Sequence, residues 1–433
     1  MKPEKNNTFC YYPFFQLALK NWGPNGIESA APCCNSIRPE NDNPLELNFK
    51  LQSMTHEGIF HSPVMRRLRE SMLKGEKHPA CTTCWKMEDN GIVSYRFYSG
   101  ADYEITQEHL LNPKLTCIDF SFGDNCNLRC RMCVPGLSNK LRIDYKYFAE
   151  NDLDSNDIQG FNRNVFEIKE WMEKDSEQNV LYWPNNSWQW KNILDNIQNI
   201  TQIKAAGGET TITKPFTEFI DRAIEIDHAK NVTLNFHTNA TKFNDTLLEK
   251  LVQFKSLELN FSIDSYGKNY EYIRYPMTWK ALDKSIRNFF DKVKDSNTNV
   301  NVQFTNVLSC LNAFNIHEIY NYWIDIKREY QDYVSMNFWI DFIWPQDKHI
   351  SVKFLSKDLK LELIEYYKNL FGGHVYPIQH IIKFLENHVE FPITDKHRKN
   401  MLREISLFDK SRNQHYKDYL DYRIINFLET EIK

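Results

Sequence analysis

Six apolar segments, each short enough to be one strand, follow one another along the middle of the chain. They cover residues 115–122, 202–207, 232–238, 257–264, 300–308 and 336–344. Valine, isoleucine, phenylalanine and leucine dominate these segments, and polar turn residues bound them. This composition predicts β-strands.

Amphipathic segments with helical spacing separate most of these strands. They cover residues 213–227, 244–254, 278–293, 315–330 and 356–371. Strands that alternate with helices of this length predict parallel βαβ units with right-handed crossovers. Six such units predict an α/β fold, a partial (β/α)6 TIM-like barrel over residues 110–350, with an insertion at about 135–200. Residues 351–433 are predicted to be a C-terminal helical region.

The composition excludes several classes of protein. The chain has 433 residues, 42% of them hydrophobic, and a net charge of −4. A charge this small, with Lys and Arg spread along the chain, gives no electrostatic footprint for nucleic acid. No apolar run reaches the ~18 residues of a membrane span, and the N-terminal residues lack the apolar core of a signal peptide. We therefore expect a cytoplasmic protein with neither nucleic acid nor membrane as a partner.

Three cysteines close together follow the first predicted strand. Cys126, Cys130 and Cys133 lie in DNCNLRCRMC with the spacing C-x3-C-x2-C. Zinc sites favour four ligands in paired C-x2-4-C knuckles, whereas three thiolates on one loop can bind three irons of a four-iron cluster. Such a cluster normally takes four thiolates. One iron would then be open to another ligand, and an incomplete zinc knuckle is the alternative.

This spacing resembles the cluster-binding loop of the radical S-adenosylmethionine (SAM) enzymes. The resemblance covers about residues 115–345 and implies that Cys126, Cys130 and Cys133 hold a 4Fe-4S cluster at which SAM is cleaved reductively. It also implies SAM contacts at the ends of the strands. Those contacts are Met132, Gly207, Gly208, Glu209, Thr238, Asn239, Ser262, Asp264, Arg274 and Asn306.

Several of these contacts have a plainer alternative. Thr238 and Asn239 could form only a cap or a turn. Arg274 could form a surface salt bridge, and Asn306 could be a satisfied polar group at a strand end. Met132 stands where the family usually has an aromatic residue, and its thioether can still pack on an adenine ring.

A second group of cysteines lies within residues 1–105. Two apolar runs on either side of GPNG predict a hairpin, Cys33 and Cys34 close its second run, and Cys81 and Cys84 form a C-x2-C pair. This arrangement resembles the twitch or SPASM-like auxiliary modules of the same superfamily, here N-terminal to the barrel.

The resemblance implies a second 4Fe-4S cluster on Cys10, Cys34, Cys81 and Cys84. Cys33 is the alternative to Cys34, because adjacent residues on a strand point to opposite faces. A structural zinc site on the same thiols is also possible. Cys117 and Cys310 are predicted to be buried small residues.

The resemblance implies an enzyme that makes a 5′-deoxyadenosyl radical and abstracts hydrogen from a substrate, with an external one-electron reductant as partner. The auxiliary module favours a peptide or protein side chain as the substrate. A small-molecule substrate and a non-enzymatic zinc-binding interaction protein are the alternatives.

Overall fold

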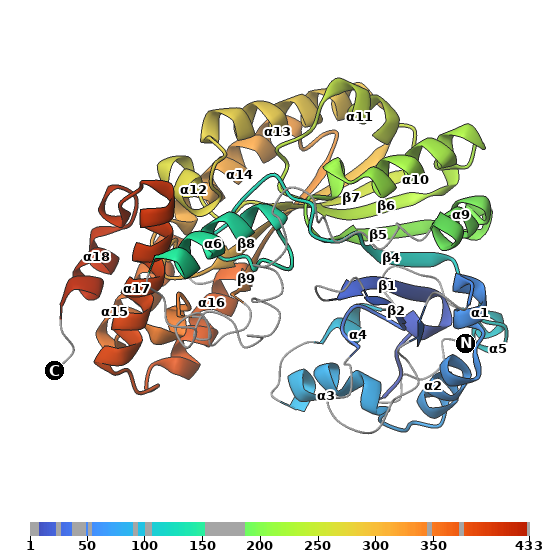
Figure 1. Cartoon of the computed structure of the whole chain (residues 1–433), viewed down its shortest axis with the longest axis horizontal. Coiled ribbons are helices and arrows are strands. Elements are labelled where there is room, and N and C mark those ends of the chain that lie inside the picture. Colours follow the sequence, from blue (N-terminus) through green and yellow to red (C-terminus); the bar gives the residue numbers. More distant parts are fainter. Residues whose placement is uncertain are drawn as a thin grey trace. The chain divides into compact units, whose positions relative to one another are not determined.

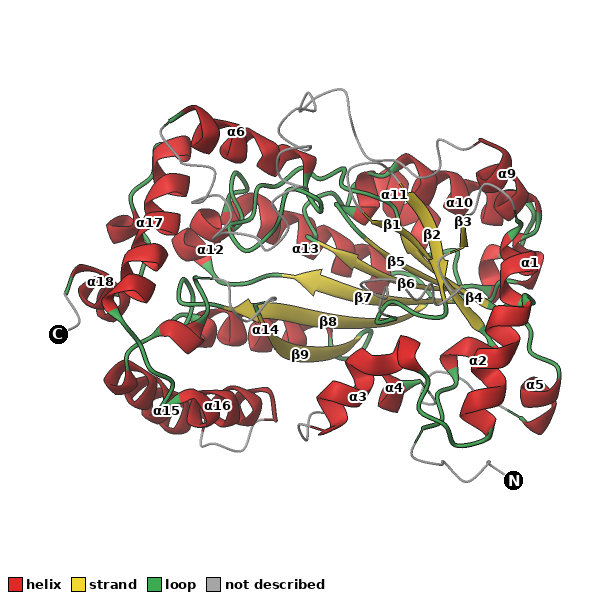
Figure 2. Ribbon diagram, turned by 60° about the horizontal axis from the view of Figure 1, so that its bottom comes forward, coloured by secondary structure: helices red, strands yellow, loops and turns green. Residues whose placement is uncertain are grey.

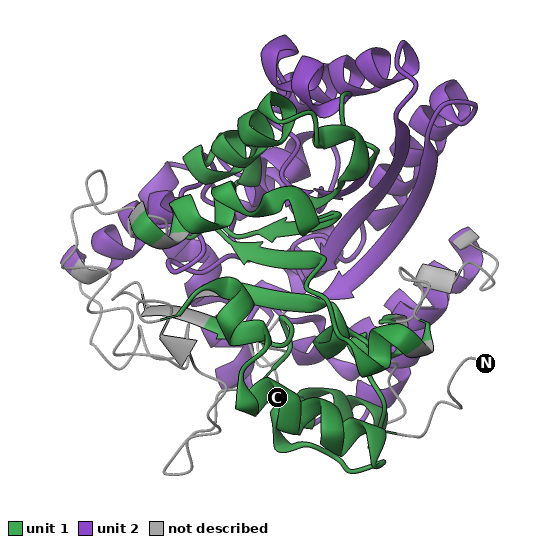
Figure 3. Cartoon of the chain, turned by 90° about the vertical axis from the view of Figure 1, so that its right-hand side faces the viewer, with its two compact units in different colours: residues 1–123, 181–236, 253–256 green, residues 124–180, 237–252, 257–433 purple. Residues whose placement is uncertain are grey.

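The computed structural model describes residues 8–22, 27–36, 49–50, 54–89, 94–99, 106–151, 187–343, 349–371 and 376–430. The chain forms two compact units, coloured separately in Figure 3. The first contains Met1–Gly123, Leu181–Phe236 and Gln253–Ser256, and the second contains Asp124–Val180, His237–Val252 and Leu257–Lys433.

The first unit contains six strands in the order β3-β2-β1-β4-β5-β6. Their bounds are β1 Gln16–Trp22, β2 Ile27–Ala31, β3 Phe49–Lys50, β4 Cys117–Ser121, β5 Gln202–Ala206 and β6 Thr233–Thr238 (Figure 1). β1 and β2 are antiparallel, which confirms the predicted hairpin strands, although its GPNG turn lies outside the described residues. β4, β5 and β6 are parallel neighbours.

β1 also pairs in parallel with β4, with Gln16 opposite Cys117 and Leu19 opposite Phe120. The hairpin of the cysteine-rich N-terminal region therefore extends the same sheet as the first predicted barrel strand. The helices of this unit are α1 His56–Phe60, α2 Pro63–Leu73, α3 Thr82–Asp89, α4 Tyr95–Tyr98, α5 Gln107–Leu111, α9 Ser187–Asp195 and α10 Lys214–Glu225.

Aromatic packing covers one face of this sheet. Phe120 of β4 lies 5.8 Å from Trp190 of α9, measured between ring centroids. Phe216 of α10 lies 5.0 Å from Phe236 of β6. Phe120, Phe216 and Phe236 are fully buried. Burying each of these side chains stabilises the fold by about 1.5–3 kcal/mol.

The second unit contains β7 Ser256–Ser262, β8 Asn299–Leu308 and β9 Ser335–Phe342, in that order. β8 and β9 are parallel, with Asn301 opposite Ser335 and Leu308 opposite Phe342. Its helices are α6 Arg142–Glu150, α11 Asp245–Leu251, α12 Gly267–Ile273, α13 Trp279–Lys294, α14 Ile316–Tyr330, α15 Lys357–Phe371, α16 Tyr376–His388, α17 Asp395–Arg412 and α18 Tyr422–Glu429 (Figure 2).

The strands of the second unit have one apolar and one polar face. Phe261 of β7 packs 6.1 Å from Phe290 of α13, and Phe338 of β9 packs 5.6 Å from Trp323 of α14. On the other face the side chain of Gln303 donates to Asn260, at 3.2 Å. Parallel strands are usually apolar on both faces, because both faces are covered. The polar face of these strands is therefore a surface that the hydrophobic core does not cover.

The α/β fold and all six predicted barrel strands are confirmed, and the C-terminal region is helical where described. Closure into a partial barrel and the domain boundaries stay predictions. Most of the predicted insertion and Trp344 lie outside the described residues. Within the described ranges, no helix combines the length and the hydropathy needed to cross a membrane.

Candidate active site

The loop that carries the three cysteines is held in place through its backbone. The Arg129 N–H donates to the carbonyl of Tyr275 at 2.7 Å, and the Arg131 N–H donates to the carbonyl of Ile273 at 2.9 Å. The Cys126 N–H donates to the side-chain oxygen of Asn139 at 3.2 Å. These bonds fix the loop at Cys126 and on both sides of Cys130.

Arg131, between the second and third cysteines, anchors the loop to the C-terminal helix α17. Its guanidinium is 2.6 Å from the carboxylate of Asp409 and lies over the ring of Tyr272 at 3.6 Å. Asp409 also accepts from the Tyr272 hydroxyl at 2.7 Å and from the Tyr416 N–H at 2.7 Å. Arg131 is 1% exposed, and such a buried pair is stable only because its remaining polar groups are also satisfied.

Arg129, on the other side of Cys130, binds a carboxylate that α17 also binds. Its Nε donates to Asp144 of α6 at 2.9 Å. Arg412 of α17 donates to the same carboxylate from Nε at 3.1 Å and from Nη2 at 2.9 Å, and the Ser411 hydroxyl donates to it as well. One buried carboxylate therefore serves two arginines.

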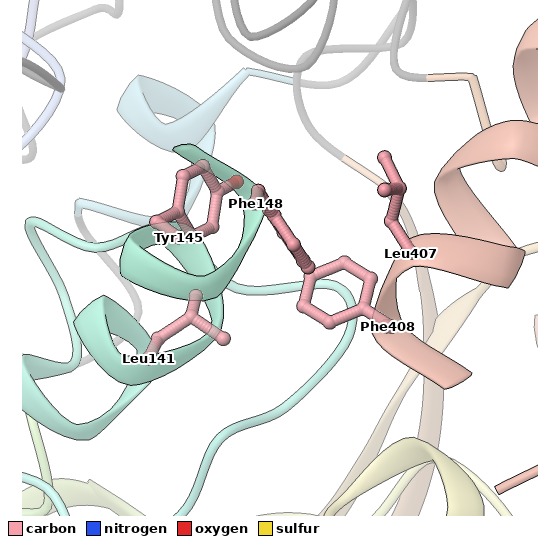
Figure 4. Close-up of a cluster of buried hydrophobic side chains, with 5 residues drawn as sticks. All are labelled: Leu141, Tyr145, Phe148, Leu407 and Phe408. Atoms are coloured by element: carbon pink, nitrogen blue, oxygen red, sulfur yellow. The ribbon is translucent and has the colours of Figure 1, made fainter. Parts of the chain in front are cut away.

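An apolar cluster joins α6 and α17 beside the third cysteine (Figure 4). Its buried members are Leu141, Tyr145, Phe148, Leu407 and Phe408, and Cys133 packs against it. The rings of Phe148 and Phe408 meet edge to face at 5.1 Å. This cluster supports one side of the cysteine loop.

Cys130 lies close to both cations and thiols. Burial is the main influence on the pKa of its thiol and raises it to about 12, and the charges of Cys133 and Asp264 act in the same direction. The guanidinium groups of Arg274 and Arg412 oppose this rise in pKa. Since iron binds the thiolate rather than the thiol, these two arginines favour the form of Cys130 that binds metal.

The predicted SAM contacts Asp264 and Arg274 bind each other. Arg274 Nε is 2.6 Å from Asp264, whose second oxygen accepts from the Val307 N–H at 2.8 Å. Burial alone would lower the pKa of Arg274, but Asp264 and Cys130 together raise it. Arg274 is 9% exposed, so the alternative of a surface salt bridge is wrong.

The chemistry and surroundings of this loop fit an anionic iron–sulfur cluster. Within the described ranges, no three Cys, His, Asp or Glu side chains are arranged to hold a single metal ion. A four-iron cluster makes a different demand, because each thiolate binds a different iron. The three thiols lie on one short, partly exposed loop, and Arg274 and Arg412 provide positive charge beside Cys130.

Asn239, another predicted contact, supports the cysteine loop. Its Nδ2 donates at 2.9 Å to Asn127, the residue after Cys126, and its Oδ1 accepts from the Thr241 N–H at 3.1 Å. Thr238 fills the turn role considered above, since its hydroxyl accepts from the N–H of Ala240, which has a φ of 59°.

The remaining predicted contacts of the second unit differ in burial. Asn306 is fully buried and donates to the Trp339 carbonyl at 3.2 Å, but its Oδ1 has no hydrogen-bond partner among the described residues. The satisfied strand-end alternative therefore holds for only half of its amide. Met132 and Ser262 are half-buried.

Gly207, Gly208 and Glu209 form a tight turn after β5 in the first unit. Gly207 has a φ of 93°, and a Cβ at this position would lie 2.9 Å from the Gly123 carbonyl oxygen. Only glycine accepts both conditions. The carboxylate of Glu209 accepts from the Thr211 N–H at 3.1 Å and from the Thr211 hydroxyl at 2.6 Å. The turn brings the backbone of Gly207 close to the backbone of Gly123.

The N-terminal cysteines also lie in the first unit. Burial raises the pKa of Cys10 to about 12, and the next contributions come from the nearby thiols Cys33 and Cys84. Burial and then Cys33 and Cys10 raise the pKa of Cys81, and Cys33 also raises that of Cys84. Cys33 thus lies within electrostatic reach of three of the four predicted ligands.

Cys34 has different surroundings. After burial, its thiol is the largest influence that raises the pKa of Tyr95. Tyr95 stacks on Tyr12 at 4.6 Å. The prediction that Cys34 is a ligand remains untested, but the thiol that acts on Cys10, Cys81 and Cys84 is that of Cys33. Cys117 and Cys310 are buried, as predicted.

Sequence reasoning missed the charged residues that hold the cysteine loop. Arg129 and Arg131 are visible inside the motif, but their partners are distant in sequence, with Asp409 separated from Arg131 by 278 positions. An acidic residue in a helix otherwise rich in basic residues carried no local signal of this role.

Comparisons with known proteins find likeness only among solved structures. No family model and no curated protein matches this chain. Native anSMEcpe with bound AdoMet shares 13% identity over 59% of this chain and 59% of its own, with a TM-score of 0.33. SuiB of Streptococcus suis bound to S-adenosylmethionine shares 14% over 70% of this chain and 62% of its own, also with a TM-score of 0.33.

SuiB bound to its precursor peptide SuiA gives 14% identity and a TM-score of 0.32 over the same shares of both chains. This chain therefore spans less than two thirds of the length of each of these structures. Likeness at such TM-scores defines neither the fold nor the function of this chain, so both must come from its own residues.

Proposed function

We propose that this protein is a radical SAM enzyme whose 4Fe-4S cluster is held by Cys126, Cys130 and Cys133. The observation that carries the proposal is a loop of three thiols with two guanidinium groups acting on its central cysteine. When bound, the cluster and SAM supply the one-electron cleavage that yields the 5′-deoxyadenosyl radical, which abstracts hydrogen from a substrate. The cofactor carries this chemistry, and the protein provides binding and orientation.

The residues of this chain then have distinct tasks. The three cysteines hold the cluster, and Arg274, held by Asp264, keeps a positive charge beside Cys130. Asn239 maintains the loop through Asn127. The SAM contacts expected at Gly207, Gly208, Glu209, Ser262, Asn306 and Met132 remain part of the proposal.

The test is anaerobic reconstitution with iron counting and measurement of 5′-deoxyadenosine after reduction with dithionite. Wild type should hold about eight irons if both clusters form, with four in each cube. Cys126→Ala should lose about half of the iron and all 5′-deoxyadenosine formation. The matched control is Cys310→Ala, another buried cysteine of the same unit. Undiminished 5′-deoxyadenosine from Cys126→Ala would refute the proposal.

The N-terminal thiols are proposed to hold a second 4Fe-4S cluster. The thiol of Cys33 raises the pKa of Cys10, Cys81 and Cys84, and four thiols this close suit a fully liganded site. A zinc ion on the same thiols is the competing assignment. Zinc analysis of protein purified without added iron separates the two assignments. One zinc per chain that Cys81→Ala abolishes would replace the cluster in this part of the proposal.

The substrate is proposed to be a peptide or protein side chain. Apart from the resemblance, support comes from the polar face of β7–β9, where Gln303 donates to Asn260 at 3.2 Å and to Thr305 at 3.1 Å. Side-chain amides both donate and accept, as peptide groups do. A peptide library should stimulate 5′-deoxyadenosine formation more than a pool of small metabolites. The reverse result would favour the small-molecule alternative.

A further inference from the structure

The arginines around the cysteine loop do not each bind a carboxylate of their own. Arg131 pairs with Asp409 and Arg274 pairs with Asp264, one carboxylate to each guanidinium. Asp144, however, is shared by Arg129 and Arg412. One aspartate therefore serves two guanidinium groups, and the side chains of Asp144 and Arg412 are both 0% exposed.

Arg412 also has an unused hydrogen-bond donor. Its Nε and Nη2 bind Asp144, while its Nη1 is buried without a hydrogen-bond partner among the described residues. A buried donor left unpaired costs about 1–3 kcal/mol, and more when the group is charged. A buried guanidinium that retains such a donor therefore points to an anion bound beside it.

The cysteine loop is the place where this anion would lie. Arg412 lies over the ring of Phe408 at 4.6 Å, in the apolar cluster against which Cys133 packs. Arg412 and Arg129 both contact the ring of Tyr275, at 5.2 Å and 5.1 Å, so they share one wall beside the loop.

We infer that Arg412 of α17 is a positioning residue for the cluster, and that its positive charge and unpaired Nη1 serve the anionic sulfurs of a cluster bound at the cysteine loop. This inference rests on the proposed function. Hydrogen bonds and charges around a cluster set its reduction potential. Because reduction adds one negative charge, a nearby cation favours the reduced state and raises the potential.

The decisive measurement is the midpoint potential of the triad cluster, taken by EPR-monitored redox titration in a background that lacks the N-terminal cluster (Cys81→Ala). Arg412→Gln should move the potential in the negative direction, because a cation is removed. Asp144→Asn should move it in the positive direction, because it frees two arginines from their carboxylate. Damage to the loop alone would move both variants in the same direction and would overturn the inference.

A second readout is retention of iron against a chelator. Loss of an outer partner typically costs 10–100-fold in metal affinity, so we expect at least about a tenfold weaker hold in Arg412→Gln. Arg412→Lys keeps the charge and should restore the potential toward that of wild type. Equal iron retention in Arg412→Gln and wild type would contradict the inference.

The matched control is Arg398→Gln. Arg398 is on the same helix and is equally buried, but it binds Asp395 at 2.8 Å and the carbonyl of Leu428. Its loss should lower stability without moving the potential. A loaded wild type whose potential is the same in Arg412→Gln overturns this inference alone. A wild type that binds no iron at Cys126, Cys130 and Cys133 overturns the proposed function and this inference with it.

Discussion

The two groups of cysteines differ in what surrounds the sulfur atoms. In the first unit, Cys10 and Cys84 are buried and Cys81 is half-buried. The largest contribution that a neighbouring thiol makes to each of their pKa values comes from Cys33. In the second unit, two arginines act on Cys130. Thiols that lie close to one another can supply every ligand of one metal centre. A thiol that faces cations belongs to a site prepared for additional negative charge, such as the carboxylate of SAM.

The largest expected effect separates the two groups by activity. Cys130→Ala should abolish 5′-deoxyadenosine formation and remove about four of about eight irons, since its cubane loses a ligand. Cys81→Ala should remove the other four and leave reductive cleavage of SAM in place. The readouts are iron content and chromatography of the nucleoside products. If Cys81→Ala also abolished cleavage, the division of labour between the groups would be wrong.

The next effect distinguishes two adjacent residues. Cys33→Ala should lose the iron or zinc of the N-terminal site, whereas Cys34→Ala should retain it. The reason is that Cys33 acts on Cys10, Cys81 and Cys84, while Cys34 acts on Tyr95. Metal analysis of the two purified variants decides the matter, and each serves as the control for the other. Metal loss in Cys34→Ala alone would instead support Cys34 as the ligand.

Breaking the Arg131–Asp409 ion pair, which anchors the cysteine loop, should have a smaller effect than losing a cluster. It should still lower the stability of the fold more than a change at the surface does. Asp409→Ala leaves the Arg131 guanidinium buried without its carboxylate, which should lower the free energy of unfolding by about 3–5 kcal/mol. The comparison variant is Glu390→Ala. It removes the exposed Lys357–Glu390 pair, for which about 0–1 kcal/mol is expected. Denaturant unfolding measures both, and equal losses would contradict the role of Asp409.

Acid should affect the two units over different ranges of pH. Burial lowers the pKa of His56 in α1 from 6.5 to about 4. Between these values the unfolded chain binds the proton and the folded chain does not, so stability falls as the pH falls from 6.5 toward 4. One pKa unit corresponds to 1.36 kcal/mol, so the loss can reach about 3 kcal/mol. His56→Gln should flatten this slope in denaturant unfolding curves.

Asp144 gives the second unit a loss of stability at lower pH. Burial alone would raise its pKa, but Arg129 and Arg412 hold it below the ordinary value of 3.8. Its contribution is therefore complete above that value and is lost only as the pH falls through the lower folded pKa. The difference in stability between wild type and Asp144→Asn should stay constant between pH 6.5 and pH 4, and a difference that changed in this range would contradict this account.

The smallest expected effect concerns the link between Asn239 and the residue after Cys126. Asn239→Ala removes the bonds to Asn127 and Thr241 and should cost about 1 kcal/mol. The control Asn337→Ala removes an exposed contact to Asn301 at 3.2 Å and should cost less. Thermal unfolding ranks the two variants, and the reverse order would weaken the assignment of Asn239 to loop support.

Local patterns predicted the fold elements well because each strand carries its own signal. The segment 257–264 became β7 Ser256–Ser262, and 300–308 became β8 Asn299–Leu308. Pairing between β1 and β4 was not predicted, because nothing in either segment specifies a partner about a hundred residues away.

The candidate site, like the fold, could be predicted from the sequence only in part. Spacing singled out the three cysteines, and the resemblance singled out the glycine turn whose Gly207 leaves no room for a Cβ. Spacing could not decide between Cys33 and Cys34. Adjacent residues of a strand point to opposite faces, but the sequence does not show which of the two faces the other thiols. It also could not show that Asp264 would hold Arg274, because that ion pair depends on how the chain turns after β7.

The anchor of Arg131 on α17 sets an order of events during synthesis. The ribosome completes the three cysteines early, but Asp409 follows Arg131 by 278 residues. A nascent chain that has emerged only as far as α16 offers an iron donor a loop with neither its carboxylate nor its helical wall. The proposed cluster would therefore be inserted only after release of the C-terminal helices, late in the maturation of this protein.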